Sequence, residues 1–197
     1  MIRELYYFLA AIMYKRRVGT LGKQTKLRFG GRILSGQYVH LADGVGLEKG
    51  FTLAVYPSFG GKDNPVMNGQ GKGIRLDENG SYNRNLTIYC ADSVYIGKNV
   101  MFGSNVLISD NEHGTDPSLD IPYREQPLTT KPVSIGDGCW VAEDAKILSG
   151  TKIGEKSIIA AGAVVKGVFP DRCVLAGVPA RIVRTWSEKE HKWVKPE

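Results

Sequence analysis

The feature that most constrains the fold of this chain is a hydrophobic period of six residues. From residue 133 to residue 165, a large aliphatic residue recurs at every sixth position, and a second column of mostly small residues precedes it by two positions. A period of six fits neither an α-helix, with about 3.6 residues per turn, nor a straight strand, whose side chains alternate. It fits a chain that runs straight for a few residues, turns and repeats. The large column contains Ile135, Val141, Ile147, Ile153, Ile159 and Val165, and the small column contains Val133, Cys139, Ala145, Thr151, Ser157 and Ala163.

The same period extends towards the N-terminus, in one clear ladder and one weaker ladder. Three six-residue sides close a coil of about 18 residues in a hexapeptide solenoid. Stacked coils bury a continuous core that no single coil buries alone. The sequence therefore predicts a mainly β solenoid and not a β-sandwich, which would need strict alternation and hairpin turns. The clear ladder pairs Ile88, Val94, Val100 and Val106 with Cys90, Ile96, Phe102 and Ile108, and the weaker one pairs Ile33, Val39, Val45 and Phe51 with Ser35, Leu41, Leu47 and Leu53.

The ladders divide the chain into one domain with two short extensions. The solenoid domain is expected over residues 27–185, with loop insertions at 57–85 and 109–132 where the repeat is lost. Residues 1–26 are expected to form an amphipathic helical extension, and residues 186–197 a charged tail or helix. Long irregular loops in a compact domain are usually functional or disordered. Because regular coils hold both ends of each insertion, we expect these two loops to carry function.

The N-terminal extension combines an apolar run, residues 5–14, with the basic cluster Lys15-Arg16-Arg17. The run is shorter than the roughly 20 residues that span a bilayer. The main basic cluster follows the run, whereas a signal peptide carries its charge before it. Two alternatives stay open: the helix packs on the body or a partner chain, or residues 1–18 lie on an anionic membrane surface. We expect a cytoplasmic protein, which in the second alternative is peripheral at the inner face of the membrane.

Composition narrows the possible ligands. The formal net charge of +6 suits an anionic cofactor, a nucleic acid or an anionic membrane surface. No basic face with interleaved aromatic residues is visible, so nucleic-acid binding is not expected. Cys90, Cys139 and Cys173 are widely spaced, with no CxxC pair, and no metal site is expected. We expect the three thiols to be reduced and packed in the core.

Several segments of the sequence resemble those of a known family. The ladders, the loop sequence NEHG at 111–114 and the ending AGAVVKGVFPDRCVLAGVPARIVR at 161–184 resemble the hexapeptide-repeat acyltransferases. The nearest branches are the galactoside and maltose O-acetyltransferases and the bacterial polysaccharide and lipopolysaccharide O-acetyltransferases, and the resemblance covers residues 27–185. It implies a left-handed parallel β-helix with a protruding loop, an acetyl-CoA cosubstrate bound between adjacent subunits of a homotrimer, and a loop histidine that acts on the neighbouring subunit's cofactor.

His113 is the predicted general base. Acetylation of a hydroxyl requires a group that takes a proton near neutral pH, and histidine has a suitable pKa. Of three histidines, His40 lies on an outward position of the first ladder and His191 lies in the charged tail, whereas His113 lies in the loop that interrupts the solenoid. The spacing from Ile96-Gly97 to His113 also matches the family. The alternative is a solvent-exposed loop histidine without a catalytic role.

The resemblance also implies the binding residues. On the acceptor side, Asn83 matches an acceptor-binding asparagine, with a plain turn residue as the alternative, and Asn111 and Glu112 precede the base. The acidic acceptor ligand of the sugar acetyltransferases falls at Ala91, which argues against a simple galactoside or maltose acceptor. The cofactor positions are Trp140, Ala142 and Ala161 for the pantetheine arm, and Arg181, Arg184 and Lys166 for the phosphates. Lys166 is displaced by one position from the family pattern, with a solvated surface lysine as the alternative.

The predicted function is acetyl-CoA-dependent O-acetylation of a sugar hydroxyl by direct transfer. The acceptor is expected to be a precursor of a bacterial surface polysaccharide (lipopolysaccharide, capsule or exopolysaccharide) at the cytoplasmic face of the membrane, as a monomer, a lipid-linked unit or a polymer. The alternatives are N-acetylation of an amino sugar, acetylation of a xenobiotic such as an antibiotic, and a non-catalytic binding solenoid.

Overall fold

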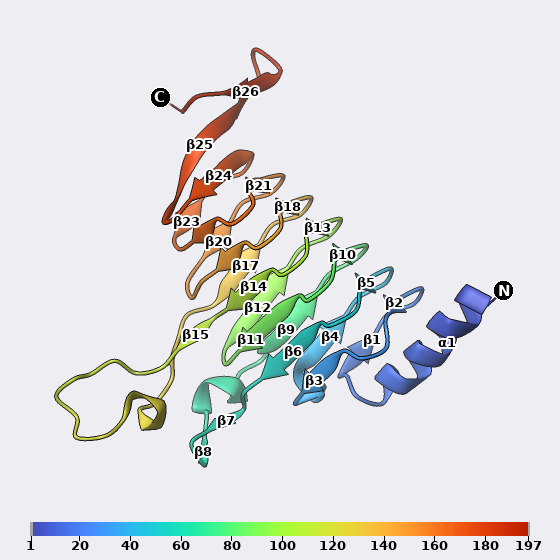
Figure 1. The fold of residues 1–197 in the computed structure, drawn as a ribbon, viewed down its shortest axis with the longest axis vertical. Coiled ribbons are helices and arrows are strands. Elements are labelled where there is room, and N and C mark those ends of the chain that lie inside the picture. Colours follow the sequence, from blue (N-terminus) through green and yellow to red (C-terminus); the bar gives the residue numbers. More distant parts are fainter. Residues whose placement is uncertain (1, 197) are drawn as a thin grey trace.

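The computed structural model describes residues 2–196, and the side chains of residues 5–196, as a three-sided parallel β-helix with a helix at its N-terminal end (Figure 1). The three sides are three parallel sheets, which we call face 1, face 2 and face 3 in the order in which each coil visits them. Face 1 contains β1 (Thr20–Leu21), β4 (Val39–Leu41), β9 (Gly73–Leu76), β12 (Ser93–Ile96), β17 (Val133–Ile135), β20 (Lys152–Ile153) and β23 (Val168–Phe169).

The two other faces complete each coil. Face 2 contains β2 (Lys26–Leu27), β5 (Gly46–Leu47), β10 (Ser81–Tyr82), β13 (Met101–Phe102), β18 (Trp140–Val141), β21 (Ile158–Ile159), β24 (Cys173–Gly177), β25 (Ala180–Ser187) and β26 (Lys192–Val194). Face 3 contains β3 (Arg32–Leu34), β6 (Thr52–Val55), β11 (Thr87–Cys90), β14 (Leu107–Ser109), β19 (Lys146–Ile147) and β22 (Val164–Val165). The edges between faces are named corner 2–3 and corner 3–1.

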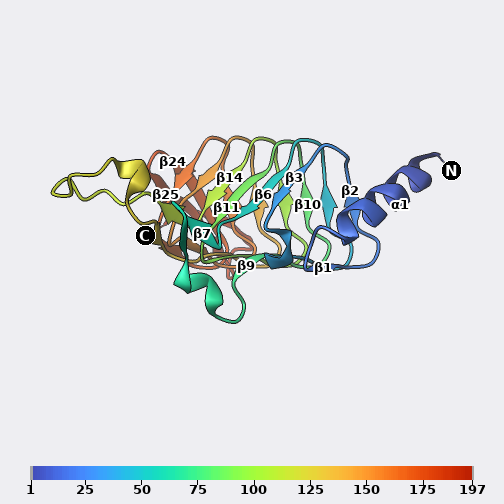
Figure 2. The ribbon, with the colours of Figure 1, turned by 90° about the horizontal axis from the view of Figure 1, so that it is seen from below.

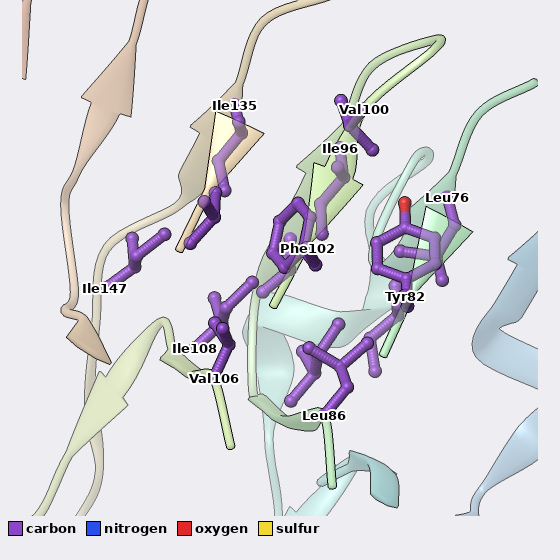
Figure 3. Packing of buried hydrophobic residues seen from close by; sticks show 14 of the residues in the cluster. Leu76, Tyr82, Leu86, Ile96, Val100, Phe102, Val106, Ile108, Ile135 and Ile147 are labelled. Atoms are coloured by element: carbon purple, nitrogen blue, oxygen red, sulfur yellow. The ribbon is translucent and has the colours of Figure 1, made fainter. Parts of the chain in front are cut away.

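The predicted ladders form the core. From Val39 onwards every residue of the two predicted columns is buried, whereas Ile33 and Ser35 of the first coil are only half-buried. Stacked apolar side chains fill the interior from coil to coil, and the ring of Tyr82 packs against that of Phe102 with centroids 4.9 Å apart (Figure 3). The three cysteines are free and buried among these side chains. The predicted solenoid is therefore confirmed, and its core is the ladder itself.

Coil length changes along the solenoid. Trp140 pairs with Ile158, eighteen positions further on, as the sequence predicts. Upstream, Thr87 pairs with Leu107, twenty positions further on. The physical reason is strand length, because β11 and β12 each have four residues, whereas β18 and β19 each have two.

Left-handed residues turn the chain at corner 2–3. Asn85, Asn105 and Asp144 have φ values of 61°, 62° and 60°. This conformation is costly for most side chains but is tolerated by asparagine and aspartate. The three also stack, since the Asn85 amide donates to Asn105 Oδ1 at 2.9 Å and the Asn105 amide donates to Asp144 Oδ1 at 3.1 Å. The corner is thus stabilised from coil to coil.

The irregular segment expected over residues 57–85 is shorter in the structure. β9 and β10 continue the solenoid within it, with Ile74 and Leu76 fully buried. What leaves the solenoid is a small hairpin, β7 (Ser58–Phe59) and β8 (Lys62–Asp63), followed by a 3₁₀ turn at Pro65–Asn68. Ile74 and Leu76 are the sequence sign of this third coil, which the polar, glycine-rich residues around them interrupt.

The two ends of the chain differ from each other. At the N-terminus, α1 (Ile2–Lys15) is the expected helix, but the first coil already begins inside residues 1–26, with β1 at Thr20–Leu21 and the start of β2 at Lys26. At the C-terminus, the alternative of a short helix is wrong: β25 runs antiparallel to β24, and β26 returns along it. The pairing is strengthened by Trp186 and Trp193, whose rings meet edge to face at 5.5 Å.

Candidate active site

Both insertions leave the solenoid at the same edge. The first connects β6 to β9 and the second connects β14 to β17, so each exits face 3 and re-enters face 1 at corner 3–1. The second, in yellow in Figures 1 and 2, stands away from the coils. Two segments that are about fifty positions apart in the sequence therefore emerge as neighbours.

The neck of the second insertion is a two-stranded antiparallel ribbon, in which β15 (Asn111–Glu112) pairs with β16 (Thr129–Thr130). Beyond the neck, the amide of the buried Gln126 joins the two sides of the loop, because it accepts from the Asp116 N–H at 2.9 Å and donates to the Asp116 carbonyl at 2.8 Å. The loop is therefore closed by its own hydrogen bonds.

Asp110 anchors this loop to the solenoid. It is fully buried, and its carboxylate accepts hydrogen bonds from the Ala91 and Asp92 amides at 2.7 and 2.9 Å. The Asn111 side chain also donates to Asp110, at 2.9 Å. Charge-assisted hydrogen bonds of this kind are stronger than neutral ones. The residue before Asn111-Glu112-His113 is thereby held at a defined place on the coil.

The first insertion is anchored at the same residue, Ala91. Asn64 donates its side-chain amide to the Ala91 carbonyl at 2.6 Å, while Asp110 takes the Ala91 N–H. Ala91, where the sugar acetyltransferases carry an acid, is fully buried between the two insertions. The position at which this chain departs from the family pattern, Ala91, is therefore the position to which both insertions are hydrogen-bonded. The neighbouring Asp92 forms an ion pair with Lys72.

His113 is exposed on this loop and touches the other insertion. Its ring lies 5.3 Å from that of Phe59, centroid to centroid, at an interplanar angle of 60°. Sequence reasoning missed Phe59, and only its aromatic character inside a polar, glycine-rich insertion could have drawn attention to it. His40 lies on face 1, where its Nδ1 is 3.2 Å from Thr20 Oγ1, and His191 lies in the turn between β25 and β26.

Glu112, next to His113 in the chain, forms an ion pair with Lys166. Lys166 follows β22 at corner 3–1, and its Nζ lies 2.9 Å from Glu112 Oε1. Both side chains are about half exposed, so the pair contributes only about 0.2–1 kcal/mol. Of the six predicted cofactor residues, Lys166 is the one that lies next to the loop that carries His113, away from the other five.

Those other cofactor residues gather on face 2. Backbone pairing aligns Met101, Trp140, Ile158 and Val174 in one column, and residues paired in this way point to the same side of a sheet. Met101 and Trp140 are 51% and 44% exposed, which makes the column an apolar strip on the outer surface. Arg184 pairs with Val174 and continues this strip with a cation.

The rest of the predicted cofactor wall borders this strip. Arg181 pairs with Ala176, on the outer side of β24, and its Nη1 donates to the Ala180 carbonyl at 2.8 Å. Ala142 follows β18 and Ala161 follows β21, so both lie at corner 2–3, the first buried and the second exposed. A narrow apolar strip with two arginines at one end matches the chemistry of a pantetheine arm and phosphates.

The predicted site residues thus fall into two separate groups. Asn111, Glu112, His113 and Lys166 lie at corner 3–1. The predicted acceptor residue Asn83 is exposed and follows β10, at corner 2–3 with the alanines of the cofactor wall. Face 3 separates these two corners within one chain. The groups can therefore meet only if corner 3–1 of one copy approaches corner 2–3 of another.

The cysteines are unsuited to catalysis. Burial raises the pKa of the Cys139 thiol to about 11. Burial, reinforced by Asp110, raises the pKa of Cys90, and burial also raises that of Cys173. A thiol with a raised pKa contains little of the nucleophilic thiolate. An acyl-cysteine intermediate is therefore disfavoured.

Among the described side chains of residues 5–196, no group of three or more His, Cys, Asp or Glu residues is arranged to hold a metal ion. The helix in this part of the chain is too short to cross a bilayer.

Comparisons with known proteins agree with this architecture. Residues 132–167 match the family described as bacterial transferase hexapeptide (six repeats). The chain is 33% identical, over 141 residues, to the putative lipopolysaccharide biosynthesis O-acetyl transferase WbbJ of Escherichia coli K12, covering 64% of this chain and 72% of that protein. It is 32% identical to the galactoside O-acetyltransferase of the same organism, covering 64% of this chain and 61% of that protein.

A solved structure extends the fold comparison. The N-acyltransferase AntD from Bacillus cereus, in complex with dTDP and 3-hydroxybutyryl-CoA, superposes with a TM-score of 0.74 at 13% identity, covering 94% of this chain and 92% of that chain. At this identity the likeness concerns the fold, a left-handed parallel β-helix. The sequence relative WbbJ, 33% identical and covered over 72% of its length, shows that the chain belongs to the hexapeptide-repeat acyltransferases. The chain is accordingly an enzyme of the acyl-transfer class.

Proposed function

We propose that this enzyme transfers an acetyl group from acetyl-CoA to a sugar hydroxyl of a bacterial surface-polysaccharide precursor, with His113 as the general base. The observation that carries the proposal is the position of His113. It is exposed on the second insertion, which Asp110 ties to the solenoid, and the ring of Phe59 from the first insertion lies beside it. The relative WbbJ, named for lipopolysaccharide biosynthesis, supports the substrate class.

The donor side is supported by the surface of face 2. Trp140, Ile158 and Val174 offer an apolar strip to the pantetheine arm, and Arg181 and Arg184 offer cations to the phosphates. Ala161 leaves room at the corner for a narrow chain. Acetyl-CoA supplies a thioester whose carbonyl carbon is the electrophile.

The assembly that joins the two groups is a homotrimer with its sites between subunits. In this arrangement, corner 3–1 of one subunit delivers His113 to corner 2–3 and face 2 of its neighbour. The exposed apolar strip around Met101 and Trp140 supports such burial, because contiguous apolar surface on a soluble protein marks an interaction site.

The transfer itself needs one proton to move twice. A ring nitrogen of His113 takes the proton from the acceptor hydroxyl as the oxygen attacks the thioester carbonyl. The negative charge that develops on that carbonyl oxygen is held by a backbone N–H on the cofactor side. His113 then returns the proton to the sulfur as the carbon–sulfur bond breaks, so that CoA leaves as a thiol.

The acceptor would lie between the two insertions. The Phe59 ring offers a flat apolar surface to the C–H groups of a sugar, and Asn111, together with Asn83 of the neighbouring subunit, offers amides to its hydroxyls. With alanine at position 91, the acceptor loses the charged ligand that the galactoside enzymes provide. A larger saccharide, recognised over more of the loops, suits this change better than a simple galactoside.

The test is CoA thiol release, measured with acetyl-CoA and saccharide acceptors, for the wild type and His113→Ala. Loss of a general base costs about 10²–10⁴-fold in rate, so we expect that drop in kcat with CoA binding intact. Amino-sugar and antibiotic acceptors are assayed in parallel, because a preference for an amine acceptor would show that the enzyme is an N-acetyltransferase. Activity in His113→Ala would show that His113 is not the general base.

The intersubunit site has its own test. His113→Ala and the double variant Arg181→Ala/Arg184→Ala are each expected to be nearly inactive alone. When the two are unfolded together and refolded, mixed trimers should contain intact sites and recover activity. Failure to recover, with trimers formed, would mean that each site is built within one chain.

A further inference from the structure

The N-terminal helix is apolar on two opposite sides, and only one of them is used by the fold. Its inner side packs on the first coil: Ala10 and Tyr14 are fully buried, and the Tyr14 ring lies 5.6 Å from that of Phe51. Tyr14 Oη accepts a hydrogen bond from the Gly31 N–H and donates to the Arg28 carbonyl, each at 3.1 Å. The helix is therefore held in one orientation.

The outer side carries an exposed apolar stripe. Leu5, Phe8, Leu9 and Ile12 are 57%, 62%, 49% and 49% exposed. Positions i, i+3, i+4 and i+7 lie along one side of a helix, so these four side chains form a single surface. Because the inner side is already packed, this stripe is not needed to hold the helix to the body.

Cations border the stripe. The groove between α1 and the first coil, about 810 Å³ in volume, is lined by Phe8, Ile12, Leu21, Lys15, Lys23 and Lys26 among others. Arg16 and Arg17 follow directly after the helix and are exposed. Two described carboxylates lie near this groove: Asp43 accepts a hydrogen bond from the Lys23 backbone, and Glu48 pairs with Arg28, which lies over the rings of Tyr6 and Tyr7. The surface is therefore apolar along the stripe and basic along the groove and at the C-terminal end of the helix.

We propose that this end of the solenoid docks on an anionic lipid bilayer, with the stripe of α1 in the interface and the surrounding cations among the headgroups. Amphipathic helices bind membranes in this way, by apolar burial combined with attraction to anionic lipids. The cytoplasmic leaflet carries the negative surface potential that such cations require. The chain would thus be peripheral at the inner face of the membrane.

Docking here deepens the proposed function, on which this step rests. The strand order of face 3 puts β14, where the His113 loop begins, three coils from β3 at the docked end. At about 4.8 Å per coil, the loop begins about 14 Å along the solenoid from that end. Figures 1 and 2 show α1 and the yellow loop on opposite sides of the molecule. An acceptor sugar held on a lipid carrier would therefore extend past several coils to reach the loop.

The experiment is co-sedimentation of the full chain with phosphatidylcholine vesicles, with and without phosphatidylglycerol, in the absence of acetyl-CoA and acceptor. We expect binding only to the anionic vesicles, weakened between about 0.05 M and about 0.5 M salt because salt screens exposed charges. Phe8→Ser/Leu9→Ser should lower the partition at least about ten-fold. Lys15→Glu/Arg16→Glu should lower it by at least about five-fold for each cation.

Controls separate the explanations. Leu119→Ser/Ile121→Ser removes apolar side chains of similar exposure, 46% and 43%, from the distant loop and should leave vesicle binding unchanged. His113→Ala should also keep it, so failure of the catalytic proposal and failure of the membrane proposal remain distinguishable. Thermal melts of the stripe variant establish that it is folded.

Three results would overturn the proposal. The first is that the wild type does not bind anionic vesicles. The second is that neither the stripe variant nor the cation variant weakens binding. The third is a wild type that sediments without vesicles as a larger assembly, which the stripe variant dissociates, since a second copy of the chain would then cover α1.

Discussion

Replacing Tyr82 by phenylalanine should stabilise the protein. Tyr82 lies in β10, its side chain is fully buried, and its hydroxyl has no hydrogen-bond partner among the residues that the structure describes. A buried polar group without a partner costs about 1–3 kcal/mol. The ring contact with Phe102 remains in Tyr82→Phe, and the vacated space is that of one oxygen atom. We therefore expect a net gain of about 1–2 kcal/mol in the free energy of unfolding.

The assay is thermal unfolding at fixed protein concentration, because assembly would make Tm depend on concentration. For a chain of this size, 1 kcal/mol corresponds to about 2–4 °C, so Tm should rise by about 2–8 °C. The matched control is Phe102→Tyr, at the position that pairs with Tyr82 on the next coil. It introduces a second buried hydroxyl and should lower Tm.

The pH dependence gives an independent check. Burial raises the pKa of Tyr82 above its ordinary value of 10.0. Above pH 10 the unfolded chain ionises this tyrosine while the folded protein keeps it neutral, so the wild type carries a loss of stability from Tyr82 that is absent in Tyr82→Phe. The advantage of the variant should grow by about 1.4 kcal/mol per pH unit above 10. A lower Tm for Tyr82→Phe would refute the reasoning, because it would mean that the hydroxyl has a stabilising partner such as a buried water.

Two further predictions concern the site. Phe59→Leu keeps an apolar side chain beside His113 but removes the ring, so KM for a saccharide acceptor should rise about three- to ten-fold while KM for acetyl-CoA stays constant; equal acceptor KM values in a steady-state comparison would contradict a role for the ring. The three buried thiols should not react with a thiol reagent at pH 8 in the folded protein and should all react on unfolding, because burial keeps their pKa values high. A thiol that reacts in the folded protein as fast as free cysteine would reopen an acyl-cysteine route.

The catalytic candidate could be chosen from the sequence because histidine is rare in this chain and, of the three histidines, only His113 lies in a loop that interrupts the solenoid. Phe59, Asn64 and Asp110 could not be chosen in the same way. Each lies in an insertion with no repeat to give it a register, and their roles depend on contacts with residues far away in the chain. Asp110, for example, is one of several acidic residues of its loop in the sequence. Only its hydrogen bonds with the Ala91 and Asp92 amides distinguish it from the others.

The sequence by itself determined the core of this protein. Each six-residue repeat specifies the same local structure, a short straight segment followed by a turn. The stacked columns that this period predicts are the buried columns of the structure. The tertiary structure alone decided what lies outside the coils. The C-terminal strands pair through contacts that local propensity does not reveal, and the two insertions meet because both exit at corner 3–1. It also separated His113 from the surface of Trp140 by a whole face, since the winding of the coil, and not distance along the chain, sets which residues are neighbours.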